Sequence, residues 1–319
     1  MTEQRIQITI VGLGSIGTSI GLALRQSQEP LFIVGHDKDP RQAGSAKKLD
    51  AVDKTDWNLI GACEKADIVI LAIPMPGIED TLRALAPHLK EGCVVTDTAS
   101  LKGQVVEWAE ALLPESVSFV GGNPVVVSAG AGPDAADANL FRGNLYCITP
   151  ASNVHPDAVS LVSGVVALLG GQPYYLDPVE HDGLMAGAEH LPQAMALALA
   201  SATMEDSIWR EMRKLAGGSF DRVISLLGED PDALSSVLLT NQSNLVRWLD
   251  AYSVAVKEVR DLVAQGEHEP LAQAVDKAVV ARREWTQERG EGFAEIKPVE
   301  VERAGFIRQM FLGGGRRRS

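Results

Sequence analysis

The sequence predicts an α/β fold, a doubly wound parallel sheet followed by an all-helical second half. Short apolar runs alternate with helical patterns from residue 6 to residue 177. After residue 178 the chain consists mostly of long helical patterns rich in alanine and leucine. It has 319 residues, of which 45% are hydrophobic, enough for two domains with separate cores. We therefore expect one domain at 1–177 and a second at 178–319.

The elements of the first half follow from periodicity and turn signals. Residues 66–74, ADIVILAIP, form a continuous apolar run, typical of a parallel strand that helices cover on both faces. We predict strands near 6–11, 32–37, 66–74, 92–100, 118–124, 144–150 and 172–177, with a short segment at 50–56 after the second helix. Helices are expected near 18–27, 40–49, 78–89, 101–113 and 156–169.

The first strand leads into a glycine-rich turn, since residues 6–17 are IQITIVGLGSIG. Gly12 allows the tight turn, Gly14 lets the backbone approach a pyrophosphate, and Gly17 lets the following helix pack on the sheet. Asp37 ends the second strand, twenty positions after Gly17, where a carboxylate can accept hydrogen bonds from a ribose. An ordinary strand–helix turn is the disfavoured alternative. The first domain is therefore expected to be a dinucleotide-binding domain of the Rossmann type.

The expected cofactor is NAD, because an acid at Asp37 would repel the 2′-phosphate of NADP. His36 and Lys38 flank this acid and keep NADP open as an alternative. The phosphates would lie at the N-terminus of the first helix, whose N–H groups and dipole favour anions. The residues expected to contact the cofactor are Gly12, Leu13, Gly14, Ser15, Ile16, Gly17, Asp37, Ile73, Pro74 and Thr98.

Composition excludes several classes of partner. The formal net charge of −13 argues against nucleic acid and against an anionic membrane surface. No signal peptide or membrane-spanning run is evident, and neither the histidines nor the cysteines have metal-ligand spacing. The three cysteines, Cys63, Cys93 and Cys147, are expected to be buried reduced thiols. We expect a cytoplasmic protein that acts on a small molecule.

The helical half has apolar faces wider than one surface helix needs. Burial against a second copy of the same helices would cover them, so we expect a homodimer through 178–319. The final GGGRRRS, residues 313–319, is expected to be a flexible basic tail.

Chemistry is expected where ligands bind in open α/β sheets, beyond the carboxyl ends of the strands. Four segments should meet there: AIPMPG at 72–77, TDTASLKG at 96–103, GGNPVVVSAGAG at 121–132 and GAEHLPQA at 187–194. The last of these is expected to start a helix of the second half.

These segments resemble, in this order, the prephenate and arogenate dehydrogenases of tyrosine biosynthesis, the TyrA family. The resemblance covers roughly residues 6–285 and is carried by VGLGSIG, DTASLKG, GGNP, AADANLFRGNLYCITP, HDGLMAGAEHLP, GGSF…DP and ARREW. It implies an NAD(P)-dependent oxidative decarboxylation, in which a hydride leaves a cyclohexadienol ring, carbon dioxide is lost and the ring becomes aromatic.

The sequence departs from the family in the candidate site. Asn123 stands where the family has the histidine that helps to remove the hydroxyl proton, and an amide cannot take a proton. Three valines, 125–127, follow where the family has small residues. Ser225 stands in place of a carboxylate-binding arginine, for which Arg222 could compensate because it lies one helical turn earlier. Arg247 is another candidate.

Several further residues have a candidate role, and most of them have two interpretations. Ser100 matches the family serine that contacts the substrate hydroxyl, or it caps the helix at 101–113. Lys102 either holds a substrate carboxylate or lies on the surface. His190 is expected to line the pocket as a catalytic residue, with Gln193 where the family has a second histidine. The histidine and aspartate at 181–182 are expected to serve domain packing or a helix start.

Three hypotheses remain open from the sequence. The first is a dehydrogenase acting on prephenate or arogenate, with Ser100, Asn123 and His190 as catalytic residues and with Lys102 and Arg222 binding substrate. The second is a divergent dehydrogenase with another substrate, suggested by the departures at Asn123 and Ser225. The third is a protein that binds NAD without catalysis.

Overall fold

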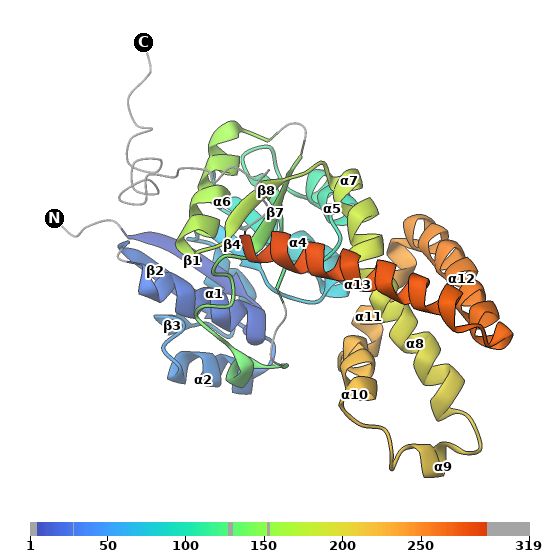
Figure 1. The fold of residues 1–319 in the computed structure, drawn as a ribbon. Helices are drawn as coiled ribbons and strands as arrows, with labels where there is room; N and C mark the ends of the chain where they lie inside the picture. The colour runs from blue at the N-terminus through green and yellow to red at the C-terminus, as the bar shows by residue number, and fades with distance from the viewer. Residues whose placement is uncertain (1–4, 28, 127–129, 152–153, 292–319) are drawn as a thin grey trace. The chain divides into compact units, whose positions relative to one another are not determined.

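The computed structural model describes residues 5–27, 29–126, 130–151 and 154–291. The described chain forms two compact units (Figure 1). Of the described residues, the sheet unit holds those up to 183 together with 228–240, and the helical unit holds 184–227 and 241–291. The predicted basic tail at 313–319 lies outside the described residues.

The sheet unit is built on one eight-stranded sheet in the order β3-β2-β1-β4-β5-β6-β7-β8. Its strands are β1 Ile6–Val11, β2 Leu31–His36, β3 Lys54–Thr55, β4 Ile68–Leu71, β5 Val94–Asp97, β6 Ser118–Pro124, β7 Leu145–Pro150 and β8 Gln172–Tyr175. The reversal of strand order about β1 is that of a Rossmann-type doubly wound fold, as predicted.

One strand pair departs from the predicted parallel arrangement. β7 runs antiparallel to β6, with Asn123 opposite Cys147, while β7 and β8 pair in parallel. The physical reason is the connection: a parallel return needs a crossover, normally a helix. The described parts of the segment between β6 and β7 contain only a short 3-10 turn, Pro133–Ala135.

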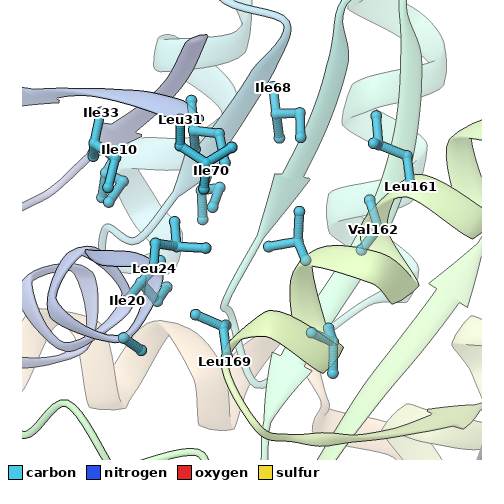
Figure 2. Close-up of a cluster of buried hydrophobic side chains, with 14 of the residues drawn as sticks. Ile10, Ile20, Leu24, Leu31, Ile33, Ile68, Ile70, Leu161, Val162 and Leu169 are labelled. Atoms are coloured by element: carbon cyan, nitrogen blue, oxygen red, sulfur yellow. The ribbon is translucent and has the colours of Figure 1, made fainter. Parts of the chain in front are cut away.

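Helices cover both faces of the sheet. They are α1 Ser15–Gln26, α2 Pro40–Lys48, α3 Leu59–Cys63, α4 Ile78–Leu85, α5 Gly103–Leu112 and α6 Pro156–Leu168. On one face, Ile20 and Leu24 of α1 and Leu161 of α6 pack with strand residues such as Ile10 and Ile70 (Figure 2). On the other face a second cluster holds side chains of α3, α4 and α5. All three cysteines are free and buried, as predicted, and Cys63 and Cys93 belong to this second cluster.

The remaining elements are helical. They are α7 Pro178–Met185, α8 Leu191–Met204, α9 Trp209–Met212, α10 Gly218–Ile224, α11 Pro231–Thr240, α12 Gln242–Gln265 and α13 His268–Glu291. α11 belongs to the sheet unit, where it lies near the 3-10 turn Met75–Gly77. Within the described ranges, no helix is both long and apolar enough to cross a bilayer.

The predicted helix start at 187–194 is confirmed, because α8 begins at Leu191. The structure adds that α7 and a π-helical turn, Ala186–His190, lead into α8 without a break. Pro192 is accommodated because it occupies an early position of α8, where its missing N–H costs little. Single π turns of this kind often occur at functional sites.

Candidate active site

The glycine turn after β1 is shaped by steric limits that only glycine satisfies. Gly12 has a φ of +94°, and a Cβ there would lie 2.2 Å from the carbonyl oxygen of Ala72. A Cβ at Gly17 would lie 1.9 Å from the Gly12 carbonyl oxygen. The strand, the turn and the helix therefore approach one another as closely as the backbone allows.

The same turn fits a dinucleotide. Gly14 is the N-cap residue of α1, and within the described chain no side chain caps it, so the first N–H groups of the helix can face an anion. A Cβ on Gly14 would meet only Gln42 Oε1, at 3.8 Å, so the space over the turn is open. Ser15 and Ile16 form the first turn of α1.

Asp37 is tied directly to this turn. Its Oδ2 accepts from Leu13 N–H over 2.7 Å and its Oδ1 accepts from Asp39 N–H over 2.8 Å. Each oxygen of an ionised carboxylate has a second lone pair, which can accept from a ribose hydroxyl. Of the other predicted cofactor residues, the half-buried Ile73 and exposed Pro74 follow β4, and Thr98 N–H donates to Leu71 O over 3.1 Å.

A buried ion pair lies at the ends of β5 and β6. Lys102 is 0% exposed, and its Nζ bonds to Asp97 Oδ2 and donates to Gly122 O over 2.7 Å. Asp97 also accepts from Ala99 N–H and Gly122 N–H, each over 3.0 Å. Burial lowers the pKa of Lys102, against the opposing effect of Asp97.

The geometry corrects the expectation for Lys102. A surface position is wrong, because the side chain is completely buried. Its ammonium bonds to Asp97 and to the Gly122 carbonyl instead of facing open space for a substrate carboxylate. Lys102 therefore joins the ends of β5 and β6, and its contact with substrate stays a prediction.

Asn123, next in the chain, is 4% exposed and belongs to a second polar set. Its Nδ2 lies 3.1 Å from Nε2 of His181, a side chain that is 0% exposed. His181 Nδ1 lies 2.9 Å from Asp182 Oδ1. Asp182 also accepts from Lys102 N–H over 2.7 Å and, through Oδ2, from Gly103 N–H over 2.8 Å. This set joins β6, α7 and the start of α5.

These contacts bear on two further expectations. The N-cap residue of α5 is Lys102, whose side chain makes no cap, so the interpretation of Ser100 as the cap is wrong. The capping acceptor is Asp182, eighty positions away along the chain. His181 and Asp182 were expected to serve domain packing or a helix start. Asp182 does serve a helix start, that of α5, and His181 contacts Asn123. Lysine is a poor N-cap residue, which was the available hint that an acceptor comes from elsewhere.

In the helical unit, His190 lies on the π turn and is 0% exposed. Its Nδ1 is 3.1 Å from Asn241 Nδ2. The Trp248 indole packs so closely on Gly187 that a Cβ there would lie 2.8 Å from it. Glu189, half-buried on the same turn, has its pKa raised by burial. No sequence pattern pointed to Glu189.

Apart from the buried Asn123, the positions that depart from the family pattern include both exposed and partly buried residues. Arg222 is exposed on α10, and Ser225 Oγ donates to the Arg222 carbonyl oxygen over 3.1 Å, so both lie in one turn. Val125 is 41% exposed, whereas Val126 packs against the core. Val127 lies outside the described residues. Within the described chain no group of three or more acidic, histidine or cysteine side chains is arranged to hold a metal.

Two family models match this chain. They describe the nucleotide-binding domain of prephenate dehydrogenase, at residues 20–175, and the dimerization domain of prephenate dehydrogenase, at residues 177–277. The chain belongs to the prephenate dehydrogenase family. The prephenate dehydrogenase of Bacillus subtilis is 29% identical over 85% of this chain and 74% of its own length. The cyclohexadienyl dehydrogenase of Zymomonas mobilis is 25% identical over 86% of this chain and 94% of its own.

Solved structures agree with this membership of the prephenate dehydrogenase family. Prephenate dehydrogenase from A. aeolicus, in complex with hydroxyphenyl propionate and NAD+, superposes with a TM-score of 0.80 at 26% identity, covering 89% of this chain and 99% of that one. Synechocystis arogenate dehydrogenase gives a TM-score of 0.70 at 28% identity, covering 88% and 100%. Together with the glycine turn and Asp37, this identifies the chain as an NAD-dependent oxidoreductase of the family.

Proposed function

We propose that this protein catalyses the oxidative decarboxylation of prephenate or arogenate with NAD, in the route to tyrosine. The observation that carries the proposal is the NAD site, because the glycine turn bonded to Asp37 is complete in a chain that belongs to this family. Asn123, in place of the family histidine, is buried and hydrogen-bonded at the end of β6. A polar group is thus retained at that position.

NAD supplies the acceptor for the hydride that leaves the ring carbon bearing the hydroxyl. The protein must orient that hydroxyl and let its proton depart. The Asn123 amide can accept a hydrogen bond from the hydroxyl but cannot keep the proton, so we infer that the proton passes to water. Ser100, in the segment that follows β5, is proposed to contact the same hydroxyl. Loss of carbon dioxide and aromatisation of the ring then make the step favourable.

Roles for residues of the helical unit remain predictions from the sequence. His190 is buried and held by Asn241, which suits a side chain with a fixed ring orientation. Arg222 offers the exposed cation that could bind a substrate carboxylate in place of the arginine that Ser225 replaces.

We also propose that the protein is a homodimer and is cytoplasmic. The match to a dimerization domain and the exposed valines of α12 and α13 support the first. The three free, buried cysteines support a reducing compartment. The division into a dinucleotide-binding domain at 1–177 and a substrate and dimerisation domain at 178–319 stays a prediction, which the ranges of the two family models support.

The test is the appearance of NADH absorbance with purified protein, prephenate or arogenate, and NAD or NADP. We expect turnover with NAD and at least one of the two acids. Arg222→Gln should raise the KM for the acid that is used. Binding of NAD by calorimetry, without turnover in any of the four combinations, would contradict the proposed reaction and leave only the cofactor site.

A further inference from the structure

The main chain before Asn123 is fixed by the buried ion pair. Lys102 Nζ donates to the carbonyl oxygen of Gly122, and Gly122 N–H donates to Asp97 Oδ1. Asn123 itself pairs with Cys147 on the neighbouring strand β7. With the backbone held on both sides, the variable that remains is which end of the Asn123 amide faces His181.

Asp182 is the fixed end of the hydrogen bonds that lead to Asn123. Its two oxygens accept from the N–H groups of Lys102 and Gly103 at the start of α5. This is the position where N–H groups and the helix dipole stabilise an ionised carboxylate. An ionised carboxylate only accepts hydrogen bonds. Any group that bonds to Asp182 must therefore be a donor.

His181 therefore donates to Asp182 through one ring nitrogen and accepts through the other. Its Nδ1 lies 2.9 Å from Asp182 Oδ1, so Nδ1 carries the hydrogen. A neutral imidazole with its hydrogen on Nδ1 has a lone pair on Nε2. Asn123 Nδ2 lies 3.1 Å from Nε2 and donates to it. The donors thus run in one direction, from Asn123 through His181 to Asp182, in a region where His181 is 0% exposed.

We propose that His181 and Asp182 are positioning residues that fix the polarity of the Asn123 amide. Nδ2 is bound to His181, so Oδ1, the only acceptor of the amide, is reserved for the hydrogen of the substrate hydroxyl. The reversed amide would present donors and would turn the hydroxyl hydrogen away. This inference rests on the proposed function, since it assigns Asn123 to the hydroxyl of the oxidised carbon.

Nitrogen-15 NMR of the native full-length protein tests the arrangement without substrate. We expect the His181 ring to carry its proton on Nδ1 and none on Nε2, with the signals assigned by their loss in His181→Gln. A ring protonated on Nε2 would overturn the proposal, because Asn123 would then have to present its oxygen to His181. This measurement does not depend on any variant retaining activity.

The kinetic constants of two His181 variants then distinguish an effect on the Asn123 amide orientation from an effect on side-chain packing. His181→Gln keeps an acceptor oxygen close to the position of Nε2, whereas His181→Leu removes it at similar volume. We expect kcat to fall roughly a hundredfold in His181→Leu with little change in KM, and to stay within about tenfold in His181→Gln. His88→Leu, on an exposed histidine after α4, is the matched control and should leave both constants unchanged.

Equal losses of kcat in the glutamine and leucine variants would overturn the proposal. If His181→Leu does not fold, the tautomer of the native ring decides. If the native protein turns over neither prephenate nor arogenate, the proposed function fails instead, and the NMR result still reports the arrangement of Asn123 and His181.

Discussion

The sheet unit and the helical unit bury their side chains very differently. The sheet unit contains two apolar clusters, one on each face of the sheet, and a completely buried ion pair. In the described part of the helical unit, the buried hydrophobic residues are Met185, Ala186, Ala196 and Leu245. Its long helices α12 and α13 expose Val246, Val254, Val256, Val259, Val263, Val275, Val279, Val280 and Trp285.

This difference indicates how each unit gains its stability. Apolar burial contributes about 25 cal/mol per Å² removed from water, so the sheet unit stabilises itself. Within one chain the helical unit buries little apolar surface and so gains little of this stabilisation. A second copy that covers α12 and α13, as in the proposed dimer, would supply this stabilisation, and the stability of the unit would then depend on protein concentration.

The largest expected effect is in the sheet unit. Lys102→Met should lower the free energy of unfolding by about 3–5 kcal/mol, because it leaves the Asp97 carboxylate buried without its counter-ion. Chemical denaturation measures this. Lys90→Met is the matched control, since Lys90 pairs with Asp67 in a partly exposed ion pair and should cost less than about 1 kcal/mol. Equal losses in the two variants would show that the sheet unit does not depend on this buried pair.

A somewhat smaller effect is expected on α12. Val256, Val259 and Val263 share one face at spacings of three and four, and all are at least 45% exposed. Val259→Asp should weaken the proposed dimer at least about a hundredfold, measured by sedimentation. Val179→Asp, on another exposed valine, is the control and should leave the dimer intact. If the native protein sediments as a monomer, the helical unit does not gain its stability from a second copy, and the proposed difference between the two units is contradicted.

We expect the affinity for NAD to depend on residues of the sheet unit alone. Asp37→Asn removes the charge that bonds to Leu13 N–H, and we expect the Kd for NAD to rise roughly tenfold, with weaker discrimination against NADP. Asp39→Asn is the control, because asparagine is an equally good N-cap residue for α2. Calorimetry with Val259→Asp sharpens the comparison, since that variant should bind NAD like the native protein.

The smallest effect concerns pH. Burial raises the pKa of the Cys63 thiol from 9.0 to about 12. Above about pH 9 the thiol of the unfolded chain ionises while the folded one stays protonated, so rising pH favours the unfolded state. Between about pH 8 and about pH 10 we expect Cys63 to account for about 1 kcal/mol of lost stability. Denaturation of Cys63→Ala should show a shallower loss, and an unchanged slope would contradict the prediction.

The features that the sequence predicted are those encoded over short distances. The glycine turn, the helix after it and Asp37 lie within one strand–helix–strand segment, and the alternation of apolar runs indicates the sheet. The antiparallel direction of β7 was not predictable in this way, because it depends on a connection without a crossover helix. The π turn at Ala186–His190 has no local signal of this kind either.

The polar set around Asn123 shows the same limit in the candidate site. Asn123 was singled out as a departure from a family pattern, but its partner His181 is fifty-eight positions away. Lys102 looked like a surface or substrate-binding residue because lysine is usually exposed. Only the pairing of β5 with β6 shows that its ammonium meets Asp97 and the Gly122 carbonyl.

Asp182 has a consequence for how this protein can change. The Asp182 carboxylate caps the first N–H groups of α5, and it also bonds to His181, the partner of Asn123. A substitution there would alter thermal tolerance and turnover together, since neither task has a separate residue. We therefore expect that a substitution of Asp182 cannot raise thermal stability without lowering turnover. Stabilising substitutions will have to be made at other positions.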